Sequence, residues 1–233
     1  MKPLCFIGAR GGSKGILRKN VRILAGKPLI AYAIESALHS DIFSSVVVST
    51  DDEEISAIAK KYGAEVPFLR PKRLASDNAT MGDVLIHGVK KLHSLGYNFD
   101  IFVNRDCTVP FIRNVDVRGS IDLLKKRNCD AVFCVYEQHL NPYFNMMETN
   151  SNGFLQFSKK LKERPQRRQD APIVYQLNGL FVYYVKQFLK FGTPFPPKSL
   201  PYVIPTETGL MIDTEFEFKM ADLIIQNKLL NVE

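Results

Sequence analysis

The first twenty residues constrain the fold of this chain more than any other stretch. Residues 2–6 predict a buried strand, and the glycine-rich loop Gly8-Ala9-Arg10-Gly11-Gly12-Ser13-Lys14-Gly15 follows it. This region carries four cations, which are Arg10, Lys14, Arg18 and Lys19. Glycines let a backbone approach phosphate oxygens, and cations crowded this closely repel one another unless an anion lies among them. The pattern therefore predicts the phosphate-binding loop of an α/β protein, with a basic turn that binds no ligand as the alternative.

Two common phosphate-binding motifs do not fit this loop. The P-loop pattern Gly-x-x-x-x-Gly-Lys-Ser/Thr cannot be laid onto its residues. Gly8 and Gly11 also have the wrong spacing for the dinucleotide-binding pattern Gly-x-Gly-x-x-Gly. The loop therefore indicates a phosphate site of another class.

The size and charge of the chain limit the functions it can have. Its 233 residues fit one large α/β domain with a small appendage, and its net charge of +7 suits either a nucleic-acid surface or an enzyme for polyanionic substrates. The basic residues gather in the first loop and at residues 159–168, without the interleaved aromatic side chains of single-strand binding platforms. We therefore expect small anionic substrates and no nucleic acid.

The sequence also indicates where the protein resides. No stretch is long and apolar enough to span a bilayer, and the apolar start at residues 1–7 is too short for a signal peptide. Its cysteines form no Cys-x-x-Cys pair and have no histidine at ligand spacing; they are Cys5, Cys107, Cys129 and Cys134. We expect a cytoplasmic protein with reduced thiols, no membrane contact, no disulfide and no zinc site.

Strand-like and helix-like segments alternate along the chain. Further strands are predicted at 46–48, 100–103, 131–136 and 180–185. Helices are predicted at 29–38, from about 53 to 62, at 84–92, at 115–126 and over 216–224. Such alternation implies right-handed crossovers and a mostly parallel sheet. The pattern loosens at about 139–174, where polar turns separate short runs, so we expect an excursion from the sheet there.

Several of these segments resemble one known family. The string from Ala9 to Gly15, with Arg18-Lys19-Asn20 and residues 24–29, closely resembles the N-terminal signature of the cytidylyltransferases that activate sialic-acid-type nonulosonic sugars as CMP conjugates. The resemblance continues at residues 48–52, 69–71, 74–77, 167–170, 177–179 and 212–215. It therefore spans nearly the full chain.

The resemblance implies a fold and an assembly. The fold would be a Rossmann-like, mostly parallel sheet flanked by helices, of the nucleotide-diphospho-sugar transferase type, with residues 1–233 forming one domain. In the family an insertion at the position of 139–174 forms an arm that embraces a second subunit, so we expect a homodimer. The alternative is a surface flap on a monomer.

The resemblance also assigns roles to residues of the first half. Arg10 and Lys19 match the catalytic cations of the family, which would stabilise charge on the α-phosphate and on the departing diphosphate. The matching nucleotide-binding residues are Ala9, Gly11, Gly12, Ser13, Lys14, Asn20, Arg70 and Asp77. Of these, Arg70 and Asp77 would lie beside the cytosine ring, and an ordinary surface ion pair is the alternative for them.

Two departures from the family pattern concern the metal. Asp106 stands where sialic-acid members have a Gln that contacts the sugar, and Met211 stands where they have the first acid of Asp-Ile-Asp. A thioether is a poor ligand for Mg²⁺, so Asp213 needs a second carboxylate. We expect Asp106 and Asp213 to hold Mg²⁺ (or Mn²⁺), an arrangement that resembles the related cytidylyltransferase for the eight-carbon acid Kdo. Asp213 has the alternative role of capping the last helix.

A third departure concerns the sugar. Gln176 stands where sialic-acid enzymes have an Arg, whereas Arg168 and Asn178 match in place. We expect Asp106, Arg168, Gln176 and Asn178 to bind the sugar. The carboxylate of the sugar would then pair with Arg168, Arg105 or Arg113.

We therefore expect a cytidylyltransferase that joins CTP to a nine-carbon nonulosonic acid, giving the CMP-sugar and diphosphate. The changed sugar loop favours a di-N-acylated legionaminic or pseudaminic acid over sialic acid. A CMP-Kdo-type synthetase and a catalytically inactive nucleotide-binding relative are the alternatives.

Overall fold

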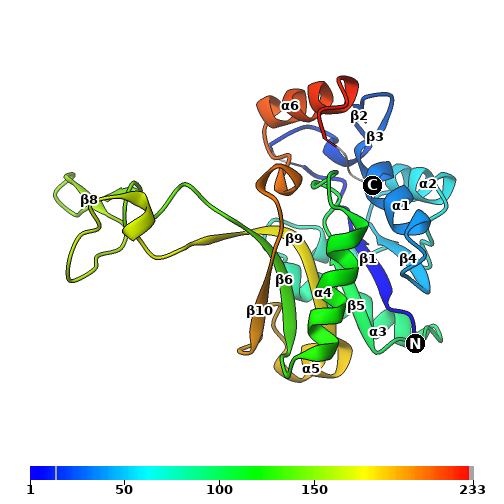
Figure 1. Ribbon diagram of the computed structural model, residues 1–233. Coiled ribbons are helices and arrows are strands. Elements are labelled where there is room, and N and C mark those ends of the chain that lie inside the picture. The colour runs from blue at the N-terminus through cyan, green and yellow to red at the C-terminus, as the bar shows by residue number, and fades with distance from the viewer. Residues whose placement is uncertain (14, 231–233) are drawn as a thin grey trace.

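The computed structural model describes residues 1–13 and 15–230, and these form one central sheet with helices on both faces (Figure 1). Among the described residues the sheet has six strands in the order β10-β6-β9-β5-β1-β4. The strands are β1 (Leu4–Gly8), β4 (Ser45–Ser49), β5 (Ile101–Arg105), β6 (Ala131–Glu137), β9 (Tyr175–Tyr184) and β10 (Ser199–Val203). β9 pairs antiparallel with β5 and β6, while the other pairs are parallel. The prediction of a mostly parallel sheet is confirmed.

Alternate side chains of the strands feed two apolar layers. On one face, Phe6 of β1 packs with residues of α3 (Met81–Ser94) and α5 (Val185–Phe191). On the other face, Cys5 of β1 packs with α1 (Leu29–His39) and α2 (Glu53–Lys61), and Val103 of β5 packs with α4 (Asn114–Lys126). The strands β1, β4, β5 and β6 are therefore buried on both sides and mostly apolar, whereas β10 and the start of β9 are partly exposed.

The remaining elements are short, apart from the last helix. α6 (Glu215–Gln226) starts at a capping box in which Thr214 and Glu217 bond reciprocally. β2 (Ile23–Leu24) and β3 (Lys27–Pro28) form a small ribbon. The 3-10 helices are η1 (Lys19–Val21), η2 (Lys72–Leu74), η3 (Arg168–Asp170) and η4 (Thr206–Gly209).

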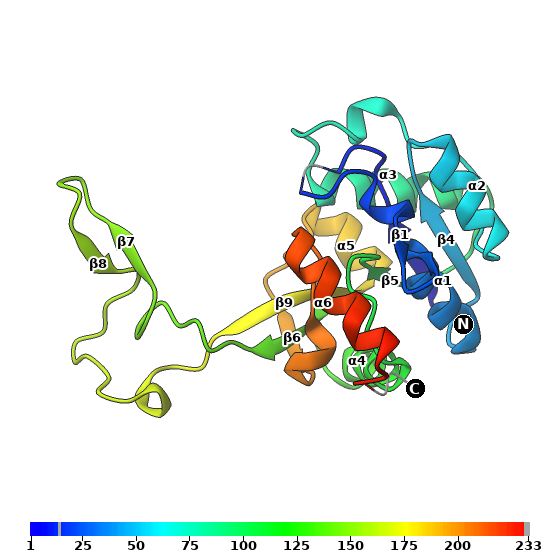
Figure 2. The same ribbon diagram turned by 90° about the horizontal axis from the view of Figure 1, so that it is seen from above.

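Residues 139–174 leave the sheet as an arm (Figures 1 and 2). The arm carries β7 (Met147–Thr149) and β8 (Leu155–Phe157), which pair antiparallel. Most of its apolar side chains are exposed, including Phe154 at 70% and Leu155 at 66%.

The sequence analysis missed α5 and β10. α5 has only seven residues, too few for a clear apolar period. β10 is an edge strand that contains Pro201, and proline argues against a strand when a sequence is read alone. All four described cysteines are free and buried. Within the described residues, no helix combines the length and apolarity needed to cross a membrane.

Candidate active site

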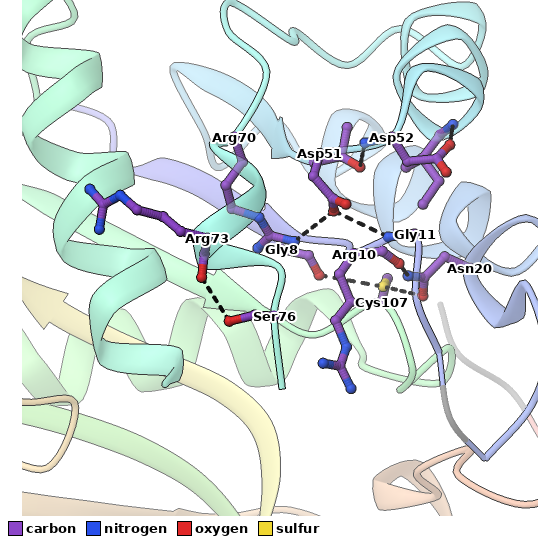
Figure 3. Close-up of polar contacts among 12 residues, drawn as sticks. Gly8, Arg10, Gly11, Asn20, Asp51, Asp52, Arg70, Arg73, Ser76 and Cys107 are labelled. Carbon is purple, nitrogen blue, oxygen red and sulfur yellow. Dashed lines mark hydrogen bonds and ion pairs between the residues drawn. The ribbon is translucent and has the colours of Figure 1, made fainter. Parts of the chain in front are cut away.

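The polar loops that follow β1, β4 and β5 meet at one edge of the sheet (Figure 3). Parallel strands bring their carboxyl ends to the same edge, where open α/β sheets bind ligands. The glycine-rich loop comes from β1, Asp51 and Asp52 come from the end of β4, and Asp106 and Cys107 follow β5.

The peptide between Arg10 and Gly11 is held at both of its ends. Its carbonyl oxygen accepts from Asn20 Nδ2 at 3.0 Å, and its N–H donates to Asp51 Oδ1 at 3.2 Å. A Cβ at Gly11 would lie 2.6 Å from Asp52 Oδ2, so only glycine fits there. Gly11 therefore allows the loop to pack closely against Asp52. In this conformation the Gly11 N–H is already bonded to the carboxylate of Asp51.

Other predicted loop residues differ in how far they are free to meet a phosphate. Ala9 is buried, and its N–H donates to the carbonyl of Ser49 at 3.0 Å. Gly12 is exposed, and a Cβ added there would meet no atom within 4 Å. Ser13 is half-buried, and Lys14 lies outside the described residues. Gly12 and Ser13 are thus the described positions of this loop best placed for phosphate.

The described cations of this region, Arg10, Arg18 and Lys19, are paired with carboxylates of the protein. Arg18 binds Asp52 Oδ2 at 2.5 Å and also contacts Glu54. Arg10 Nη1 lies 3.3 Å from Asp77 Oδ1. Contrary to the expectation from the sequence, Arg18 needs no external anion, because Asp52 and Glu54 at the start of α2 neutralise it. Arg18 in turn holds the pKa of Asp52 below its usual range.

Lys19 reaches across to the C-terminal part of the chain. Its Nζ donates to the carbonyl of Ile212 at 2.7 Å and to Asp213 Oδ1 at 2.8 Å. The side chain is 13% exposed, whereas that of Asp213 is 60% exposed. An ammonium group has three donors, so Lys19 keeps one beyond these two bonds.

A cavity of about 400 Å³ opens beside the loop. Its polar lining includes Arg10, Arg70, Asp77 and Asp106, and its apolar lining includes Phe6. The Arg70 side chain is 4% exposed, and its Nη2 lies 3.3 Å from Asp51 Oδ1. Burial lowers the pKa of Arg70, and the charge of Asp51 opposes this shift. The Nε of Arg70 is buried and has no hydrogen-bond partner among the described residues.

A second cleft, of about 440 Å³, lies between η4 and α6. Asp213, Gln176 and Gln138 line it together with apolar side chains, and the amide of Gln138 donates to Gln176 at 2.5 Å. The apolar lining consists of Tyr136, Leu210, Met211, Met220, Ile224, Leu229 and Leu230.

Asp106, Lys19 and Asp213 form one electrostatic cluster between the two cavities. Asp106 Oδ1 accepts from the Thr108 N–H at 2.9 Å. Burial raises the pKa of Asp106; the Thr108 N–H and Lys19 oppose the shift, whereas the charge of Asp213 adds to it. Among the described residues no group of three or more acids, histidines or cysteines is arranged to hold a metal. A metal here would therefore take two carboxylates from the protein and its other oxygens from substrate or water.

Two residues expected at the sugar lie elsewhere. Arg168 belongs to the arm, where its Nη1 is 3.4 Å from His139 Nδ1, and it lines a separate cavity at the base of the arm. Asn178 has no exposed surface; its Oδ1 accepts from the Leu180 N–H, and its Nδ2 has no partner among the described residues. Direct contact between Asn178 and a sugar would require β9 to move.

Two of the three candidates for the sugar carboxylate are committed to the protein. Arg105 has no exposed surface, and its Nη2 donates to the Ile112 carbonyl at 3.2 Å. Arg113 binds both oxygens of Asp116, at 2.7 and 2.9 Å. As the last residue of β5, Arg105 has its side chain buried in the core, so it is not free to meet a sugar carboxylate.

Sequence reasoning missed the contacts that Asp51 and Cys107 make in this site, although residues that follow a strand next to β1, as Asp51 does, must lie beside the loop. Cys107 is 1% exposed, and its Sγ lies 3.2 Å from Asn20 Oδ1. In the sequence, this cysteine differs from the other three in that it falls in a polar loop.

Known proteins with a similar sequence cover almost the whole chain. A sequence profile of the family described as cytidylyltransferase matches residues 4–196. The pseudaminic acid cytidylyltransferase of Campylobacter jejuni is 34% identical, over 96% of this chain and 96% of its own. The CMP-N,N'-diacetyllegionaminic acid synthase of the same species is 30% identical, over 98% of this chain and 97% of its own.

A solved structure has the same fold. CMP:2-keto-3-deoxy-manno-octonic acid synthetase, determined in complex with CTP, superposes with a TM-score of 0.72 over 98% of this chain and 100% of its own. Its sequence identity is 18%, so the likeness concerns the fold alone. The predicted Rossmann-like architecture is confirmed.

Proposed function

The chain belongs to the cytidylyltransferase family, and on that premise we propose that it joins CTP to a nine-carbon nonulosonic acid. The anomeric hydroxyl of the acid would attack the α-phosphorus of CTP. The new bond links the sugar oxygen to that phosphorus, the bond to the β-phosphate breaks, and the hydroxyl proton is released. The products are the CMP-sugar and diphosphate.

One observation carries this proposal: two cavities flank the same cluster of Asp106, Lys19 and Asp213. Asp106 lines the cavity beside the glycine-rich loop, and Asp213 lines the cleft beside α6. A nucleotide in the first cavity and a sugar in the second would meet at this cluster. Arg10 and Lys19 would then stabilise the charge that develops on the phosphates.

The buried Nε of Arg70 supports a preference for cytosine. This donor lacks a protein partner among the described residues and belongs to a side chain that lines the nucleotide cavity. A buried donor without a partner is costly, so a ligand acceptor is expected there. Ring atom N3 of cytosine is an acceptor, whereas N3 of uracil carries a proton. A donor facing this atom therefore selects CTP over UTP.

Asp106 and Asp213 fit a divalent cation. Mg²⁺ prefers hard oxygen ligands and is commonly held by one or two carboxylates plus substrate phosphates and water. Both aspartates interact with the charge of Lys19, and Asp106 lines the first cavity whereas Asp213 lines the second. A bound Mg²⁺ or Mn²⁺ would offset negative charge on the phosphoryl oxygens.

The lining of the second cleft supports a di-N-acylated sugar. Met211 and Leu210 stand close to Asp213 in the sequence and line the same cleft, with Met220 and Ile224 of α6. Acyl groups bring apolar methyls that such side chains would remove from water. This favours acids of the legionaminic or pseudaminic type over sialic acid, in line with the names of the two relatives.

The arm supports a homodimer. Its exposed apolar side chains include Met147, Phe154 and Leu155. Contiguous exposed apolar surface commonly marks an interaction site, and a second copy of the chain would cover it. A cytoplasmic location follows from the proposed use of CTP.

A substrate panel tests the proposed function. Diphosphate release would be followed with CTP, Mg²⁺ and each of four acids (legionaminic, pseudaminic, sialic and Kdo), and with no acid as the control. The expected result is release with a di-N-acylated nine-carbon acid. Turnover of Kdo alone would identify a CMP-Kdo-type enzyme, and CTP binding without release in any mixture would identify an inactive relative.

A further inference from the structure

Asp51 connects two parts of the site that come from different loops (Figure 3). One of its oxygens, Oδ1, accepts from the Gly11 N–H at 3.2 Å and from Arg70 Nη2 at 3.3 Å. Gly11 belongs to the glycine-rich loop, and Arg70 lines the nucleotide cavity. The Asp51 side chain is 18% exposed and that of Arg70 is 4% exposed, so these contacts are largely screened from water.

We propose that Asp51 is a positioning residue that ties Arg70 to the phosphate loop and thereby sets the preference for CTP. This inference rests on the proposed function. Asp51 does not itself touch the nucleotide in this account. It acts through the orientation of the Arg70 guanidinium and of the Arg10–Gly11 peptide.

The Arg70 guanidinium has few other restraints. Its Nε has no partner among the described residues, and its Nη2 donates to Asp51 Oδ1 at 3.3 Å, a contact that restrains the plane of the group. A guanidinium is planar, and fixing Nη2 fixes the direction in which Nε donates. Removal of the Asp51 charge would release that plane and leave the buried cation without its carboxylate.

Asp51 is free for this task because its neighbour caps the helix. Asp52 Oδ1 accepts from the Ile55 N–H at 2.9 Å, and Asp52 also binds Arg18. The two adjacent aspartates thus have different roles. Asp52 caps α2 and neutralises Arg18, whereas Asp51 binds the Gly11 N–H and Arg70. This division provides a matched control within the same dipeptide.

The opposite end of the Arg10–Gly11 peptide is held independently. Asn20 binds the Arg10 carbonyl at 3.0 Å, and the Cys107 thiol lies 3.2 Å from Asn20 Oδ1. The peptide is therefore restrained from two sides, by Asn20 and by Asp51. Asp51 also accepts a hydrogen bond from Arg70, and Arg70 lines the nucleotide cavity together with Asp77. Asp51 therefore links the peptide to the cavity.

The test compares Asp51→Asn, Asp51→Ala and the control Asp52→Asn with the parent protein. The first keeps an acceptor for the Gly11 N–H but removes the charge, and the second removes both. For each protein, kcat and KM are measured with CTP and with UTP, and folding is checked by circular dichroism. We expect Asp51→Asn to raise KM for CTP about tenfold, with a smaller change in kcat, and to lower the CTP:UTP ratio of kcat/KM. Asp52→Asn should leave this ratio unchanged.

The double variant Asp51→Asn/Arg70→Ala separates positioning from a general structural role. Once Arg70 is gone, loss of the Asp51 charge should not change the CTP:UTP ratio further. A folded Asp51→Asn protein with the parental ratio would overturn the inference. If the Asp51 variants do not fold, the NMR chemical shift of the Arg70 Nε–H is measured in the parent protein with each nucleotide instead. A change in this chemical shift with CTP and none with UTP supports the inference, and equal changes with both nucleotides contradict it. If the parent protein binds neither nucleotide, it is the proposed function that fails.

Discussion

Lys19 and Asp213 form an ion pair of 2.8 Å although 194 positions separate them in the sequence. The pair closes the C-terminal segment onto the phosphate loop, and a Cβ at Gly15 would lie 2.3 Å from the carbonyl oxygen of Asp213. The basic start and the acidic end of the site are therefore packed together. A phosphate or a metal that binds here would have to interact with Lys19 and Asp213 while these two side chains are paired with each other.

Lys19→Ala and Arg10→Ala are each predicted to lower kcat by about 10²-fold or more, because each removes a preorganised charge from the phosphates. Initial rates with saturating CTP and acid would measure the effect. Lys2→Ala is the control, since Lys2 pairs with Asp41 on the surface at the amino end of β1. Near-normal rates in both site variants would remove the assignment of the phosphate loop.

Asp106→Asn and Asp213→Asn are each predicted to raise the Mg²⁺ concentration that supports half-maximal activity. The reason is that each variant removes one of two proposed carboxylate ligands. Titrations of activity with Mg²⁺, at fixed CTP and fixed acid, would measure the shift. If Asp106→Asn instead changes only KM for the acid, then Asp106 binds the sugar and not the metal.

The ion pair of Asp52 predicts a pH-dependent contribution to stability. Arg18 lowers the pKa of Asp52 in the folded protein, so the folded state binds fewer protons than the unfolded state near the ordinary pKa of about 4. The contribution is present above that pH and is lost as the pH falls through the lowered pKa. Asp52→Asn should cost about 1 kcal/mol or less at pH 7, because the pair is partly exposed. Urea unfolding at pH 7 and at pH 3 would show a difference from the parent at pH 7 that is smaller at pH 3.

The arm predicts how the protein assembles. Phe154→Asp and Leu155→Asp should convert a dimer to monomers, because a charge in a covered apolar contact is costly. Light scattering coupled to size exclusion would measure the mass. Phe216→Asp is the matched control: Phe216 is 71% exposed, close to the 70% of Phe154, but lies on α6 and not on the arm. A monomeric parent protein, or dimers in all variants, would contradict the assignment of the arm.

Much of the architecture could be predicted because most central strands are short apolar runs and the helices have a clear period. Val46–Val48 and Leu29–Leu38 are examples, and both fall within β4 and α1. β10 could not be predicted, since Pro201 hides an edge strand whose pairing partner is distant in the sequence. The sequence also placed Arg10 and Lys19 on one loop but could not show which carboxylates pair with them. Asp213 and Asp77 come from other parts of the chain, and only tertiary structure brings them there.

The same limit explains the outcome at individual residues. Arg105 is a candidate ligand in the sequence, but as the last residue of β5 it lies on the same face as Val103, and its buried side chain donates to the Ile112 carbonyl. Gly11 is expected at the nucleotide, and in the structure its N–H donates to Asp51. Both outcomes depend on which face of a strand or loop a group occupies, and one residue of register decides this.

The most direct test of the account is a phosphorus NMR spectrum of the protein with CTP, Mg²⁺ and a di-N-acylated nonulosonic acid. The account predicts that the three resonances of CTP decline while a phosphodiester resonance and that of diphosphate rise in equal amounts, and only when the acid is present. Unchanged CTP in every mixture, or conversion to CDP and inorganic phosphate without a phosphodiester, would contradict it.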